Sequence, residues 1–102
     1  MSPSPAGLDT IIHAPVRLAI MSALARGDEL EFTALRDTVE TSDGNLSTHA
    51  AKLEKAGYIK LRKRFVNKRP QTLYRITPAG QDAFLRYLDA LQALLPPRGG
   101  SS

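Results

Sequence analysis

The hydrophobic pattern of this chain changes its period at Gly57, and this change restricts the folds open to it. Before Gly57, apolar residues recur at every third or fourth position, which is the spacing of one helix face. Residues 58–76 instead alternate apolar and polar, often basic, side chains, which is the period of strands with one buried face. From residue 78 the helical period returns. Because 102 residues suit one compact domain, the pattern predicts helices and a strand pair that share a single core.

Prolines and glycines mark the boundaries of the first and last helices. The first helix is expected to begin at Pro15, because proline fits the first helical turn but lacks the N–H that a helix interior needs. It is expected to end before Gly27. The last helix is expected over residues 78–95, with Thr77 as its N-cap and Pro78 at its first position.

A short strand and two more helices are expected between these. Residues 29–32 alternate in the period of a strand. A second helix is expected over residues 33–40, with Thr33 as its cap. The polar residues 41–44 then form a turn, and a third helix is expected over residues 43–56.

Two strands follow the third helix and form a basic hairpin. They are expected at residues 58–66 and 71–77, joined by a turn at residues 67–70. Their expected inward-facing residues are Ile59, Leu61, Tyr74 and Ile76. Residues 1–7 and 96–102 are rich in Pro, Gly and Ser, so they are expected to be flexible tails around a domain of residues 8–95.

The composition excludes several kinds of function. There is no Cys, so disulfides, thiolate metal sites and cysteine nucleophiles are absent. The two histidines, His13 and His49, fall on separate predicted helices, so no metal site or other cofactor is expected. No nucleophile with a paired base and no phosphate-binding glycine loop is visible, so an enzyme is not expected. No secretion signal or membrane span is recognised, and a cytoplasmic protein is expected.

The charge is divided unevenly along the chain. Residues 44–76 carry nine Lys and Arg side chains and only one acidic residue, Glu54. The remaining residues carry five basic and nine acidic side chains. Such asymmetry indicates a surface for a polyanion on a neutral or acidic scaffold. The alternative interpretation is a solvated basic face that keeps an exposed strand soluble and free of unwanted pairing.

The third predicted helix has one apolar and one polar face. At ~100° per residue, Leu46, Ala50 and Leu53 share one side. The opposite side carries Asn45, Thr48, Lys52 and Lys55. Asn, Thr and Lys side chains can contact base edges or phosphates in a DNA major groove. The order of the predicted elements is that of a winged helix-turn-helix domain, whose third helix enters that groove.

Three stretches of the chain resemble MarR- and ArsR-type winged-helix transcriptional regulators. Residues 47–49 (STH) together with 52–59 (KLEKAGYI) are similar to the recognition helix and the following strand of these regulators. Residues 13–20 (HAPVRLAI) resemble their opening helix, and residues 73–80 (LYRITPAG) the end of their wing and the start of their final helix. The resemblance covers residues 8–95 and is closest to the short single-domain members. It implies an α+β, mainly α fold with a two-stranded basic wing and a C-terminal dimerisation helix.

The resemblance also implies a function and the residues that perform it. The expected protein is a sequence-specific regulator of transcription that binds double-stranded DNA, as a homodimeric repressor without a cofactor or membrane partner. Helix 43–56 would read the major groove, and wing 59–76 would contact the minor groove or the backbone. The expected DNA-contact residues are Asn45, Ser47, Thr48, His49, Lys52, Lys55, Arg62, Arg64, Asn67, Lys68 and Arg69.

The last helix is expected to form the dimer contact. Regulators of this kind usually dimerise through terminal helices, and residues 78–95 would run ~27 Å at ~1.5 Å per residue. The expected dimer residues are Phe84, Tyr87, Leu88, Leu91, Leu94 and Leu95. The alternative is that this apolar stripe belongs entirely to the core of one protomer. An alternative for the whole protein is an adaptor whose basic wing docks on an acidic protein, since fold alone does not determine function.

Overall fold

The computed structural model describes residues 7–96, so most of the two predicted tails lies outside the described residues. Its elements in chain order are α1 (Pro15–Leu24), β1 (Leu30–Glu31), α2 (Phe32–Val39), α3 (Asp43–Lys55), β2 (Ile59–Val66), β3 (Arg69–Ile76) and α4 (Pro78–Leu94). The expected order of helices and strands is confirmed.

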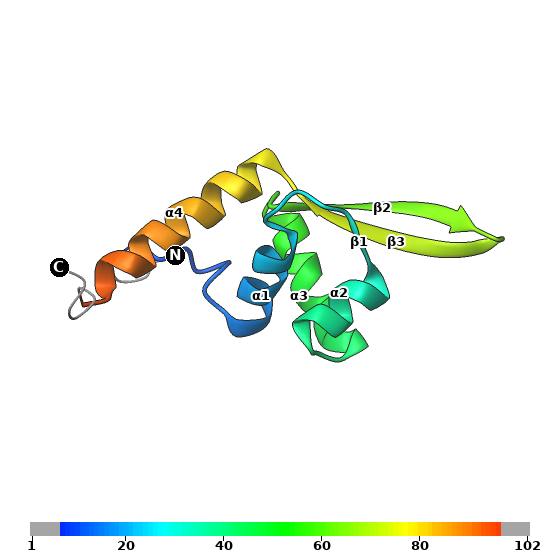
Figure 1. Ribbon diagram of the computed structural model, residues 1–102, viewed down its shortest axis with the longest axis horizontal. Coiled ribbons are helices and arrows are strands. Elements are labelled where there is room, and N and C mark those ends of the chain that lie inside the picture. The colour runs from blue at the N-terminus through cyan, green and yellow to red at the C-terminus, as the bar shows by residue number, and fades with distance from the viewer. Residues whose placement is uncertain (1–6, 97–102) are drawn as a thin grey trace.

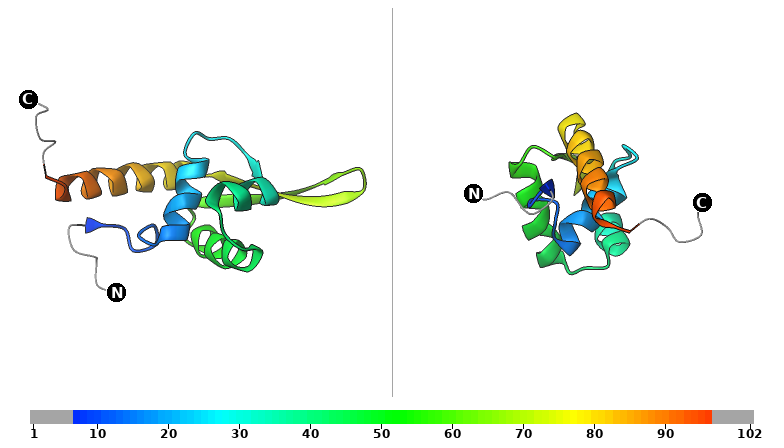
Figure 2. Two further views of the ribbon diagram at one scale, coloured as in Figure 1. Left: turned by 60° about the horizontal axis from the view of Figure 1, so that its bottom comes forward. Right: turned by 90° about the vertical axis from the view of Figure 1, so that its left-hand side faces the viewer.

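The strands form one antiparallel sheet in the order β1-β3-β2, so the short β1 pairs with β3 beside the hairpin. Helices α1, α2 and α3 lie together on one side of this sheet (Figure 1). The hairpin of β2 and β3 projects beyond them at one end, and α4 runs away from them toward the other (Figures 1 and 2). The molecule is therefore elongated, with extents of 56 × 35 × 25 Å.

The core lies between the helices and one face of the sheet. Its fully buried residues include Ile20, Leu24, Leu35, Leu46 and Leu53 from the three clustered helices. The sheet contributes three of the four residues expected from alternation, Ile59, Tyr74 and Ile76, and Leu61 packs against them half-buried. Burial of these apolar faces is the main term that holds the domain together.

Leu73 is also buried, although alternation places it on the outer face of the sheet, with its neighbours Tyr74 and Ile76 inward. Its register partners are Glu31 of β1 and Arg62 of β2. A central strand with neighbours on both sides covers more of its side chains than a two-stranded hairpin does. The short β1 thus buries a residue that a hairpin alone would expose.

The helix boundaries agree with the predictions except at the start of α2. Pro15 occupies the first turn of α1, and Gly27 beyond its end has a left-handed φ of 93°. The prediction that Thr33 caps the second helix is wrong. That helix begins at Phe32, and the side chain of Glu31 accepts a hydrogen bond from the backbone N–H of Thr33 at 3.1 Å. The carboxylate of Glu31, two positions before Thr33, satisfies a free N–H of the first helical turn instead.

The predicted four-residue turn of the hairpin is also wrong. Arg69 and Pro70 already belong to β3, so only Asn67 and Lys68 connect the strands. Both have left-handed backbones, with φ of 51° and 64°. A two-residue turn of this kind suits the right-handed twist of paired strands. Pro70 is tolerated because β1 pairs only with Leu73 and Tyr74, which leaves one side of β3 open at that point.

Close packing at Gly80 joins the start of α4 to the start of the hairpin. The hydroxyl of Thr77 accepts from the N–H of Gly80 at 2.9 Å, as expected of an N-cap, and donates to the backbone oxygen of Gly57. A Cβ at Gly80 would lie 2.0 Å from the backbone oxygen of Tyr58, so only glycine fits this contact. The direction in which α4 leaves the sheet is set here.

Candidate nucleic-acid interface

Helix α3 presents the polar face that its sequence predicts. Leu46, Ala50 and Leu53 are at most 1% exposed and attach the helix to the core. On the other side five of the expected contact residues are exposed, namely Asn45, Ser47, Thr48, Lys52 and Lys55. Because the buried face holds the helix in place, these side chains occupy defined positions on its outer surface.

The start of α3 is tied to the preceding helix. The side chain of Ser42 accepts from the N–H of Asn45 at 3.1 Å and caps α3. Arg36 of α2 donates to Asp43 at 2.9 Å and also contacts Asp37. Hydrogen bonds to Asp43 and Asp37 raise the pKa of Arg36. The pair across the turn orients α2 and α3, although exposed ion pairs add little to stability.

His49 lies at the border between the two faces of α3. It is half-buried, and its Nδ1 lies 3.0 Å from Nη1 of Arg17 in α1. Burial lowers the pKa of His49, and the positive charges of Arg17 and Lys52 lower it further. The family resemblance implies a DNA contact for His49, but the sequence contains no signal for its partner, because Arg17 is on another helix.

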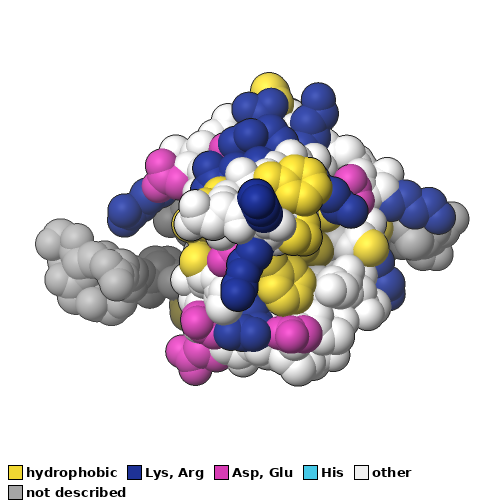
Figure 3. Space-filling view, turned by 90° about the vertical axis from the view of Figure 1, so that its right-hand side faces the viewer, with side chains coloured by type: hydrophobic (Ala, Val, Ile, Leu, Met, Phe, Trp, Pro, Cys, Tyr) yellow, Lys and Arg dark blue, Asp and Glu magenta, His cyan; other side chains and the backbone are white. Residues whose placement is uncertain are grey.

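Three consecutive residues at the end of the hairpin have exposed side chains. Asn67 and Lys68 form the turn, Arg69 follows them, and all three are exposed. Figure 3, which faces the end of the hairpin, shows Lys and Arg side chains around it together with hydrophobic ones. The projecting hairpin thus holds this basic end beyond the helices (Figure 1).

The cations along the hairpin divide between its two faces. Because strand side chains alternate, Lys60, Arg62 and Arg64 lie on the face opposite the helices. Lys63 and Phe65 continue the row of Ile59 and Leu61 and lie on the face that carries the helices. The interpretation from sequence did not include Lys63 or Phe65 among the contact residues, although the same alternation would have placed them on that face.

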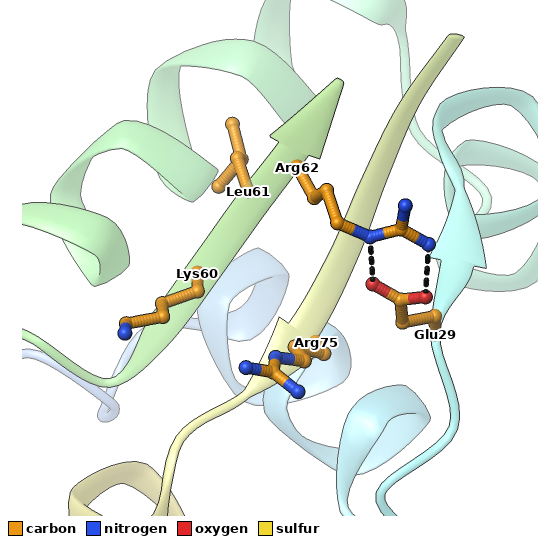
Figure 4. Close-up of a pocket in the computed structure, with 5 residues that line it drawn as sticks. All are labelled: Glu29, Lys60, Leu61, Arg62 and Arg75. Carbon is orange, nitrogen blue, oxygen red and sulfur yellow. Dashed lines mark hydrogen bonds and ion pairs between the residues drawn. The ribbon is translucent and has the colours of Figure 1, made fainter. Parts of the chain in front are cut away.

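Arg62 is engaged within the protein. It reaches across β3 toward Glu29 and donates two hydrogen bonds to its carboxylate, at 3.0 and 2.7 Å (Figure 4). This hydrogen bonding lowers the pKa of Glu29, and the positive charges of Arg62, Arg75 and Arg64 act in the same direction. The pair borders an open hollow of approximately 350 Å³ that Lys60 and Arg75 also line.

Arg64 is partly engaged as well, since its Nε donates to the side chain of Gln71 at 3.2 Å. Of the expected hairpin contacts, the freest side chains are therefore at the turn: within residues 7–96 neither Lys68 nor Arg69 forms an ion pair.

The outer half of α4 exposes apolar side chains. Phe84 and Tyr87, expected at a dimer contact, are buried in the core of the protomer, and Tyr87 also contacts Nδ1 of His13 at 2.8 Å. Leu91 is half-buried. The exposed large apolar residues of α4 and its cap are Leu85, Leu88, Leu94 and Leu95. Core packing thus covers Phe84, Tyr87 and part of Leu91, and leaves Leu88, Leu94 and Leu95 exposed.

The described part of the chain contains neither a membrane-spanning helix nor a metal-binding cluster. None of its helices has the length and apolar character needed to cross a membrane. Residues 7–96 also contain no group of three His, Cys, Asp or Glu side chains that could hold a metal ion.

Comparison with known proteins agrees with this architecture. The family described as "Winged helix DNA-binding domain" matches residues 16–95. An uncharacterized protein of Methanocaldococcus jannaschii, MJ0432, is 33% identical over 78 residues, which are 76% of this chain and 85% of that protein. The structure of a transcriptional regulator homologue from Pyrococcus horikoshii superposes with a TM-score of 0.76 at 33% identity, over 82% of this chain and 83% of that one.

A MarR-family transcriptional regulator from Silicibacter pomeroyi shares the fold, with a TM-score of 0.63 at 22% identity over 86% of this chain and 55% of that one. The chain belongs to the winged helix DNA-binding domain family and is similar to regulators of transcription, which are not enzymes. The predicted winged-helix fold and the resemblance to winged-helix transcriptional regulators are confirmed, and the MarR-family structure shares that fold.

Proposed function

We propose that this protein is a sequence-specific regulator that binds double-stranded DNA as a homodimer and represses transcription. The observation that carries the proposal is the outer face of α3, where Asn45, Thr48 and Lys52 are exposed above a fully buried apolar face. A helix held in this way can enter a major groove. Occupation of a promoter would then block polymerase.

Specificity and affinity are assigned to different parts of the surface. Asn45 and Thr48, near the start of α3, carry short side chains that suit contacts to base edges. Lys68 and Arg69 at the hairpin end supply free positive charge for phosphates at the neighbouring minor groove. Contacts to phosphate contribute most of the affinity but little preference for sequence.

The dimer is proposed to form through the outer half of α4, where Leu88 and Leu95 are 39% and 60% exposed. Apolar side chains that gather on an exposed surface usually mark a contact with another molecule. A two-fold dimer would present two α3 helices ~34 Å apart, the spacing of successive major grooves on one side of a duplex.

The experiment measures binding by fluorescence anisotropy over a range of salt concentrations. The probes are duplexes selected from genomic fragments and a random duplex of equal length. Lys68→Ala or Arg69→Ala should weaken binding to both and reduce the salt slope by about one unit for each lost contact. Asn45→Ala or Thr48→Ala should instead reduce the preference for the selected duplex, by about tenfold for a lost base contact of ~1–3 kcal/mol.

Arg26→Ala is the matched control, because Arg26 is an exposed cation just beyond α1, outside the proposed interface. It should leave both affinities unchanged. Equal losses on selected and random DNA for all four interface variants would contradict the assignment of roles.

A second candidate function is an adaptor that docks on an acidic protein. It is favoured by the cations on the outer face of the sheet, away from the helices. Among residues 7–96, Lys60 and Arg75 face each other in register and neither forms an ion pair. Absence of any duplex bound more tightly than random DNA, even at low salt, would favour this function over the first.

A further inference from the structure

We propose that Arg17 is a positioning residue for the DNA-contact helix. It holds the ring of His49 in the neutral form with the proton on Nε2, so that this N–H is presented to a phosphate or base acceptor of the duplex. The inference rests on the proposed function only in that α3 binds DNA. The form of the His49 ring is a property of the free protein.

Arg17 is fixed at two points. Its Nε donates to the backbone oxygen of Ile11, in the segment that leads into α1. Its Nη1 lies 3.0 Å from Nδ1 of His49 in α3. Both side chains are half-buried. A planar guanidinium held at two of its nitrogens has little freedom to rotate, so it defines where the imidazole ring lies.

The chemistry of the two groups decides the position of the proton. A guanidinium carries only donors and stays charged in proteins. Nδ1 of His49 must therefore be the acceptor and carry no proton. A neutral ring then has its proton on Nε2. The burial of His49 and the positive charges of Arg17 and Lys52 favour the neutral ring as well.

His49 lies beside the proposed DNA-contact residues of α3. His49 follows Asn45 by four positions and precedes Lys52 by three, and such positions are neighbours on a helix surface. Within residues 7–96, Nδ1 is the ring nitrogen of His49 that has a hydrogen-bond partner, and Nε2 has none. An oriented donor without a partner in the protein is suited to an acceptor on the duplex.

A neutral donor differs from a cation in how its contribution depends on salt. A hydrogen bond from a neutral ring to a phosphate releases no counterion, whereas each phosphate neutralised by Lys or Arg contributes ~0.9 to the salt slope. Loss of the Arg17 contact should therefore weaken binding without changing the slope. A loss of about one unit of slope would identify Arg17 itself as a phosphate contact.

The first experiment uses the full chain without DNA. Nitrogen-detected NMR of protein labelled in His and Arg should show an unprotonated Nδ1 on His49 and a scalar coupling to Nη1 of Arg17 across the hydrogen bond. In Arg17→Met the coupling should disappear and the pKa of His49 should rise toward its ordinary value. A protonated Nδ1, or a titration of His49 that Arg17→Met leaves unchanged, would overturn the proposal. If Arg17→Met does not fold, the presence or absence of the scalar coupling in the unaltered protein decides whether the proposal holds.

The second experiment measures affinity for a duplex selected from genomic fragments. Arg17→Met should weaken binding about fivefold, as expected for one hydrogen bond, with the salt slope unchanged. In a His49→Ala background the same substitution should have no further effect. Arg26→Met controls for the loss of a charge near α1. Equal weakening by Arg17→Met with and without His49 would overturn the proposal. If no duplex binds, the proposed function fails, and the NMR result still decides the form of the ring.

Discussion

At the scale of single residues, side chains of the same type play different parts because their partners differ. Arg62 and Arg69 are both exposed arginines of the hairpin. Arg62 is held by two hydrogen bonds to Glu29, whereas Arg69 forms no ion pair among residues 7–96. A phosphate that approached Arg62 would meet a positive charge that is already paired with a carboxylate. We therefore expect Arg62 to contribute less to DNA binding than Lys68 or Arg69.

The state of His49 leads to a prediction about stability and pH. The folded protein holds the pKa of His49 below the ordinary value of about 6.5, chiefly by burial and then by Arg17 and Lys52. Between the lowered pKa and 6.5 the unfolded chain binds more protons, so stability rises with pH in that interval. The contribution of His49 to the free energy of unfolding is therefore fully present above pH 6.5, and it is lost as the pH falls through the lowered pKa.

Chemical unfolding at a series of pH values compares the unaltered protein with His49→Gln, which keeps a polar side chain but does not titrate. The difference in the free energy of unfolding between them should shift in favour of the variant as the pH falls below about 6.5. Parallel curves for the two proteins would contradict the prediction.

At the scale of elements, most boundaries follow from the local sequence. Pro15 and Pro78 begin helices at their first turn because the fixed φ of proline suits that position. At the two boundaries that were predicted wrongly, neighbouring residues can play the same structural role. Glu31 and Thr33 can both cap α2, and the turn of the hairpin depends on how far the strands pair. Local propensity does not decide such cases.

The cap of α3 gives a prediction at this scale. Ser42→Ala removes the hydroxyl that accepts from the N–H of Asn45 and should lower the free energy of unfolding by about 1 kcal/mol. Ser47→Ala, on the exposed surface of the same helix, is the control and should change stability by less than about 0.5 kcal/mol. Urea unfolding of both variants provides the test, and equal effects would show that the cap contributes nothing specific.

At the scale of the whole molecule, the hairpin and α4 extend in opposite directions from a small core (Figure 1). The start of α4 packs on the core through Ala83 and Phe84, and its outer half leaves Leu88 and Leu95 uncovered. The proposed DNA contacts lie on α3 and at the hairpin end, whereas the proposed contact with a second protomer lies on the outer half of α4. This separation lets two protomers join without covering either proposed DNA surface.

The dimer is tested by placing charge on the exposed stripe. Leu88→Glu together with Leu95→Glu should give a monomer in analytical ultracentrifugation, because two carboxylates would have to be buried in the contact. The variant should remain folded, since both positions are exposed in the protomer. Ala93→Glu, on the opposite side of the same helix, is the matched control and should stay dimeric. An unaltered protein that is monomeric at all concentrations tested would refute the dimer itself.

Local sequence patterns were enough to predict the order of the elements, the buried faces of α3 and of the hairpin strands, and the basic character of residues 44–76. These properties follow from periodicity and composition, which act over a few neighbouring residues. The folded structure alone shows that Arg62 pairs with Glu29, that Arg17 lies within hydrogen-bond distance of His49, and that Leu73 is buried beside β1. Each of these depends on residues more than thirty positions apart that meet only when the core brings their elements together.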